Sequence, residues 1–165
     1  MARRLAAAAI ISYLLAVLQT TIGGRLALAG VAPDLLLVWV ICIGLLAGPR
    51  AGVVAGFACG ALEGSLLQGS IGSLAISKGI AGLGAGIISA SMSRDHWLVP
   101  PIAAILLTLV AEAAFLSLSG LSGCWAYAAR VIGVRAVYHA VLSAIAFAAV
   151  SRGWRATTET GPEVA

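Results

Sequence analysis

Long apolar stretches, separated by short polar or glycine-rich breaks, run through almost the whole chain. This pattern predicts six helices over residues 5–22, 33–47, 51–68, 73–91, 102–119 and 131–150. The first breaks are strong ones, because glycine and proline interrupt helices; they lie at 23–25, 48–50 and 69–72. A helix that crosses a bilayer needs about 20 mainly apolar residues. Six such helices would therefore use nearly the entire chain.

The remaining connections carry polar and aromatic residues. Residues 93–96 form a predicted polar loop, followed by Trp97 as an anchor at the membrane interface. The longest predicted loop is 120–130, with Trp125 and Tyr127 at interfacial positions. Residues 1–150 are thus predicted to form a single transmembrane helical bundle, and residues 151–165 a short polar cytoplasmic tail.

Composition supports lipid as the solvent of this chain. Hydrophobic residues make up 61% of it and charged residues only 10%, with a mean hydropathy of +1.07. A soluble domain carries roughly 25% charged residues. In lipid every backbone polar group must be satisfied within the protein, which favours an all-α membrane bundle. Arg3 and Arg4 precede the first apolar run, which lacks a small-residue cleavage site and is interpreted as a helix.

The arginines predict the orientation of the bundle. With six spans, both termini lie on the same side of the membrane. That side carries six arginines: Arg3, Arg4, Arg50, Arg94, Arg152 and Arg155. The other side carries three: Arg25, Arg130 and Arg135. Cytoplasmic segments carry the excess of arginine, so both termini are predicted to be cytoplasmic. A five-span alternative would place the C-terminus outside. The net charge of +4 comes from these helix ends and indicates topology, not nucleic-acid binding.

Glycine recurs every four residues along the third predicted helix, at Gly52, Gly56, Gly60 and Gly64. These positions share one face of a helix, and glycine lets two helices approach closely in lipid. The next helix repeats the spacing with Gly82 and Gly86. Packing between helices of this chain is one interpretation, and a docking face for another membrane protein is the other.

Ionisable residues at membrane depth are candidates for function, because they are costly there. The candidates are Glu63, Lys78, Glu112 and His139. If the third and fourth helices form a hairpin that turns near residue 70, Glu63 lies opposite Lys78, the only lysine, and an ion pair is predicted. The alternative is that Lys78 extends its ammonium to the interface.

A second hairpin gives a second hypothesis. If the loop between the fifth and sixth helices is centred near residue 125, Glu112 comes level with His139, and the two would form a hydrogen bond. The alternative is two separate polar residues that face the interior. Gln19, Thr20 and Thr21, near the end of the first helix, are interpreted as ordinary interhelical hydrogen-bonding groups.

Known catalytic and metal-binding patterns are missing from the sequence. The cysteines Cys42, Cys59 and Cys124 form no CxxC pair, and neither HExxH nor GxSxG occurs. We therefore expect no enzyme activity, no metal site and no cofactor.

The second to fourth predicted helices resemble the rod shape-determining protein MreD family. Pro33 and Asp34 at the head of the second helix carry this resemblance, together with the segments 32–37, 44–49, 52–57, 60–63 and 69–72. Members often have an aspartate near the end of the glycine stripe, where this chain has Glu63. The length and the number of spans also fit.

The resemblance implies a non-enzymatic scaffold of the bacterial elongation machinery in the inner membrane, needed for rod shape and lateral peptidoglycan synthesis. Its implied partners are MreC, with RodA, a class B penicillin-binding transpeptidase and MreB as further members of the assembly.

The family fold is also similar to the substrate-binding S component of energy-coupling-factor transporters, which gives an alternative function: binding a vitamin or similar small molecule. That function needs a polar extracytoplasmic pocket. Short loops and the absence of asparagine argue against such a pocket. A membrane protein with a purely structural role is a third possibility.

Overall fold

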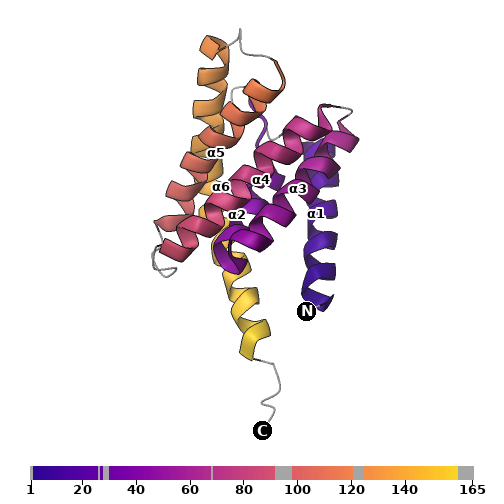
Figure 1. Cartoon of the computed structure of the whole chain (residues 1–165), viewed down its shortest axis with the longest axis vertical. Helices are drawn as coiled ribbons and strands as arrows, with labels where there is room; N and C mark the ends of the chain where they lie inside the picture. Colours follow the sequence, from indigo (N-terminus) through magenta and orange to yellow (C-terminus); the bar gives the residue numbers. More distant parts are fainter. Residues whose placement is uncertain are drawn as a thin grey trace.

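A computed structural model describes residues 2–25, 27, 30–67, 69–91, 98–120 and 125–159. In this part of the chain six helices follow one another and no strand occurs (Figure 1): α1 Ala2–Ile22, α2 Leu35–Ala47, α3 Pro49–Leu66, α4 Ile71–Ser91, α5 Val99–Leu118 and α6 Trp125–Glu159. Three of them are long and apolar enough to cross a membrane, over Ile71–Ser91, Val99–Leu118 and Ala129–Ser151. Ala6–Ile22 and Leu35–Ala47 are shorter apolar helices. The all-helical prediction is confirmed, whereas six complete spans stay a prediction.

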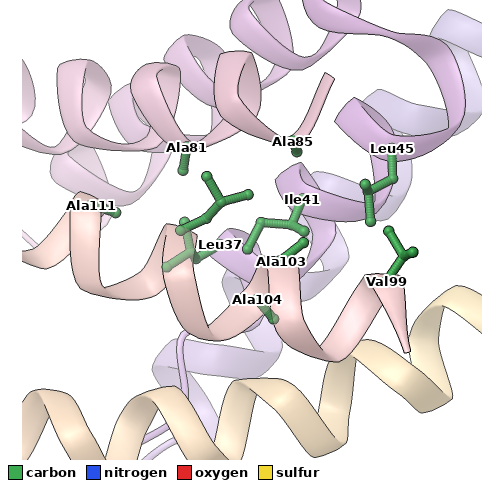
Figure 2. Close-up of a cluster of buried hydrophobic side chains, with 10 residues drawn as sticks. Leu37, Ile41, Leu45, Ala81, Ala85, Val99, Ala103, Ala104 and Ala111 are labelled. Carbon is green, nitrogen blue, oxygen red and sulfur yellow. The ribbon is translucent and has the colours of Figure 1, made fainter. Parts of the chain in front are cut away.

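The short helix α2 is the centre of the bundle. Leu37, Ile41 and Leu45 on one of its faces pack against small residues of α4 and α5, as Figure 2 shows. The opposite face packs against α1 and α3 through Leu36, Trp39 and Val40. Apolar side chains therefore surround α2 on all sides, which agrees with a sequence that is hydrophobic throughout.

The glycine stripe lies inside the α3–α4 hairpin. A Cβ atom added to Gly52 would lie 2.1 Å from the carbonyl oxygen of Gly82, and one added to Gly56 would lie 2.2 Å from that of Lys78. Gly60 and Gly64 face the first turns of α4 in the same way, and Gly86 faces Pro49. The stripe thus brings two backbones of the same chain into contact, as the internal-packing interpretation predicted.

Several helix ends differ from those predicted. Pro49 occupies the first turn of α3, where a missing N–H costs nothing, and α4 already begins at Ile71. Helix α6 begins at Trp125, so the predicted loop over 120–130 is wrong from residue 125 onward. It continues to Glu159, so the predicted tail begins as a helix. The predicted loop at 93–96, Trp97 and Cys124 lie outside the described residues.

Helix α6 is longer than the apolar core of a bilayer is thick. Its 35 residues measure about 52 Å at about 1.5 Å per residue, whereas the hydrocarbon core is about 30 Å thick. Its last turns therefore lie beyond the apolar segment, toward the same end of the molecule as the start of α1 (Figure 1). This arrangement agrees with the predicted placement of both termini on one side.

Candidate functional site: a charged junction at the start of helix α2

Helix α2 needs partners for its first backbone N–H groups. Its 13 residues cover only about 20 Å, less than the usual thickness of the apolar core of a bilayer. The first four N–H groups of a helix have no partner within it, and lipid offers none. Asp34 is the N-cap, and its Oδ1 accepts a hydrogen bond from the N–H of Leu37 at 2.8 Å. Pro33 therefore precedes the helix instead of starting it.

Two side chains from distant helices satisfy the other N–H groups. The Gln19 Oε1 on α1 accepts from the N–H of Leu35 at 2.8 Å and from that of Leu36 at 3.2 Å. The N–H of Asp34 donates to His139 Nε2 on α6 at 2.8 Å. The start of α2 is thus the point where α1 and α6 meet through polar contacts. Gln19 was predicted to be an ordinary interhelical hydrogen-bonding group; it does bond between helices, but its role in capping α2 was missed. For Thr20 and Thr21 the same prediction was wrong, because both hydroxyls bond within α1.

Three charged residues, which we call the charged junction, lie at the same place: Asp34, Glu63 and Lys78. The Lys78 Nζ on α4 lies 2.9 Å from Glu63 Oε2 on α3 and forms a second ion pair with Asp34. Lys78 is only 2% exposed, so its ammonium does not extend to the interface. The predicted Glu63–Lys78 pair is present, and Asp34 is an additional carboxylate that the hairpin argument did not consider.

The charge of Asp34 is stabilised by its surroundings. The Lys78 ammonium and the N–H of Leu37 both interact favourably with the carboxylate of Asp34. A negative charge also interacts favourably with the positive end of the α2 dipole. Asp34 therefore has two electrostatic partners, the ammonium and the helix terminus.

His139 and Glu112 do not bind each other, so this prediction was wrong. His139 Nδ1 lies 2.9 Å from Thr108 Oγ1, and Glu112 forms an ion pair with Arg135. Because α6 already begins at residue 125, the centre of the α5–α6 hairpin lies before residue 125, where it had been predicted. Glu112 therefore comes level with Arg135, one helical turn before His139.

The contacts of His139 also define its protonation. Because Nε2 accepts the N–H of Asp34, a neutral ring carries its proton on Nδ1 and donates it to Thr108 Oγ1. The imidazole is fully buried. It therefore connects the start of α2 with α5 and α6 as a neutral donor and acceptor.

Replacement of His139 by leucine tests this structural role. We expect His139→Leu to lower the free energy of unfolding by about 1–3 kcal/mol, because the N–H of Asp34 is left without an acceptor. Unfolding in detergent, followed by circular dichroism, measures the change. Val137→Ala is the control, since Val137 on the same helix is exposed to lipid. An equal loss in both variants would contradict the role.

A cavity of about 430 Å³ opens beside the charged junction. Asp34, Glu63, Lys78, Glu112 and Arg135 all line it. The rest of its wall comes from the end of α1, the α3–α4 turn and the end of α5, through residues that include Gln19, Thr20, Gly23, Gly24, Ser70 and Phe115. All of these segments lie at the end of the bundle opposite the start of α1 and the end of α6. The short loops argued against a polar pocket; the cavity is formed by helix ends, and its lining is mainly apolar.

The charged groups that line the cavity are paired with one another and are not arranged as metal ligands in the part of the chain that the structure describes. Among the described residues no group of three or more His, Cys, Asp or Glu side chains is placed to hold a metal ion. The charged groups are engaged with one another and with the start of α2. A group that enters the cavity therefore meets charges that are already paired.

Comparison with known proteins identifies the family of this chain. The model of the family described as rod shape-determining protein MreD matches residues 1–150. No curated protein and no solved structure matches the chain. The matched residues include all helices up to the end of the apolar part of α6, and hence every residue of the charged junction and of the cavity.

Proposed function

Since this chain belongs to the MreD family of rod shape-determining membrane proteins, we propose that it is a non-enzymatic scaffold of the elongation machinery that binds MreC. In this role it supports lateral peptidoglycan synthesis from the inner membrane. RodA, a class B penicillin-binding transpeptidase and MreB are the further expected members of the assembly. Six spans with both termini in the cytoplasm complete the proposal.

The cavity is the observation that supports a binding role, and we place the MreC contact there. With cytoplasmic termini, the cavity opens on the extracytoplasmic side, because its walls are the helix ends farthest from the termini. A single-pass partner whose soluble part lies outside the membrane brings its membrane-proximal segment to that level. A volume of about 430 Å³ accommodates a few side chains of such a segment.

The size of the cavity also favours a second candidate function. Small-molecule sites commonly measure about 300–1,000 Å³, so the cavity is large enough for a vitamin-sized ligand, as in an S component. Its polar wall consists mainly of charged groups that are already paired. This leaves few free hydrogen-bonding atoms for a small ligand, and we therefore prefer the scaffold.

A pair of neighbouring threonines allows a matched test. Thr20 and Thr21 are both exposed, and both hydroxyls donate to the carbonyl oxygen of Val17. Only Thr20 lines the cavity. We expect the tagged protein to co-purify with co-expressed MreC. Thr20→Trp should reduce the amount of MreC that is recovered at least tenfold, whereas Thr21→Trp should leave that amount unchanged.

The outcomes distinguish the scaffold from the small-molecule binder, and they test whether MreC binds at the cavity. Recovery of no MreC by the unmodified protein would contradict the scaffold. A small molecule retained by the purified protein in native mass spectrometry, and lost in Thr20→Trp, would favour the second candidate. Equal recovery of MreC by both tryptophan variants would keep the scaffold but reject the cavity as the contact.

A further inference from the structure

Helix α1 contacts the rest of the bundle along a narrow line. Among its described side chains, residues 6–22, only Ala16 is buried. Ala8, Ser12 and Ala16, four residues apart, face α2 and α3. The other faces of α1 carry large apolar side chains such as Ile10 and Leu14, both more than half exposed. In Figure 1 this helix stands at the edge of the bundle.

Apolar contacts alone do not fix such a helix in lipid. The exposed face of α1 is surrounded by lipid tails, which are as apolar as the bundle surface, so docking gains little from burial. Association then depends on close packing and on hydrogen bonds between helices. Two side chains of α1 provide these bonds: Ser12, whose hydroxyl accepts from Trp39 Nε1 at 3.0 Å, and Gln19.

Gln19 is the stronger of these two attachments. Its Nε2 donates to Glu63 Oε1 at 2.7 Å, while its Oε1 accepts from the first N–H groups of α2. One amide therefore joins α1 to both α2 and α3. The same end of α1 lines the cavity through Gln19, Thr20, Gly23 and Gly24, and Glu63 lies in the cavity wall beside it.

We propose that α1 is a movable wall of the cavity and that Gln19 is the residue that fixes it against the bundle. The apolar core shared by α2, α4 and α5 contains no residue of α1, because Leu37, Ile41 and Leu45 pack there against α4 and α5. Movement of α1 would open the cavity sideways into the membrane. The proposal stands whichever partner or ligand the cavity takes.

A disulfide between α1 and α3 measures whether α1 is docked. Ser12 Oγ lies 3.5 Å from Cys59 Sγ on α3, so the thiol of a Ser12→Cys variant would lie close to Cys59. The background carries Cys42→Ala and Cys124→Ala, which leaves these two thiols alone. Copper phenanthroline oxidises the pair in membranes, and a maleimide-linked polymer then counts the free thiols after unfolding.

We expect rapid disulfide formation in this background and a rate at least tenfold lower when Gln19→Leu is added. Gln19→Glu should also slow it, because it keeps an acceptor for the α2 N–H groups but places a carboxylate against Glu63. Thr21→Val is the control and should leave the rate unchanged, since the Thr21 hydroxyl bonds only within α1. Helix content and cooperative thermal unfolding should persist in all variants.

Two results would overturn the proposal. An unchanged rate of disulfide formation in both Gln19 variants would mean that α1 is held by packing. If both variants lost cooperative unfolding as well as disulfide formation, α1 would not move separately from the bundle.

Discussion

Replacement of Lys78 by methionine should lower the free energy of unfolding by about 3–5 kcal/mol, the usual loss when one partner of a buried ion pair is removed. Methionine keeps most of the apolar length of lysine but lacks its ammonium. Asp34 and Glu63 then share a buried site without a cation between them. Unfolding of the purified protein in detergent by urea or dodecyl sulfate measures the loss, and Ile80→Ala, on the exposed face of the same helix, is the control.

A compensating variant distinguishes the ion pairs from simple packing. The triple variant Lys78→Met, Asp34→Asn, Glu63→Gln removes all three charges, and asparagine remains a good N-cap. Replacement of a complete buried ion pair by well-packed hydrophobic residues often costs no stability, and in the triple variant the two carboxylates become uncharged amides that need no cation. We therefore expect the triple variant to regain most of the stability that Lys78→Met loses. Additive losses in the triple variant would contradict the interpretation of the charged junction as mutually dependent charges.

The helices and the α3–α4 hairpin could be predicted because their signals are local. Apolar runs and glycine–proline breaks place five of the six helices within a few residues of their observed ends. The turn near residue 70 then sets Glu63 against Lys78 by symmetry alone. The sixth helix was misplaced at both ends, because Trp125 and Tyr127 were interpreted as interfacial loop residues and because polar residues after Val150 remain helical.

The rest of the junction depends on contacts between helices far apart in the sequence. Gln19 reaches α2 and α3, and His139 reaches Asp34 across 105 positions. Hairpin symmetry relates neighbours only, so it cannot identify these partners. A signal was nevertheless available, since a short apolar helix needs acceptors for its first N–H groups in lipid. The polar residues at the same depth, Gln19 and His139, were the candidates for that role.

Replacement of Gly52 by alanine should have the second large effect, a loss of about 1–3 kcal/mol or more, as is typical of overpacked cores. The added Cβ would lie 2.1 Å from the carbonyl oxygen of Gly82 and 2.8 Å from its carbonyl carbon. Both atoms belong to the backbone, so no side chain can rotate away. The helices α3 and α4 must separate, and this also moves Lys78 away from Glu63. Unfolding in the same detergent measures the loss.

Gly133 provides the matched control, because it lies within α6 and an added Cβ there meets nothing within 4 Å. Alanine forms helices better than glycine by up to about 1 kcal/mol, so Gly133→Ala should leave stability unchanged or raise it slightly. The same propensity gain applies to Gly52→Ala, and the difference between the two variants therefore isolates the cost of separating two backbones. If Gly52→Ala proved as stable as Gly133→Ala, the close approach of α3 and α4 would not hold the charged junction together.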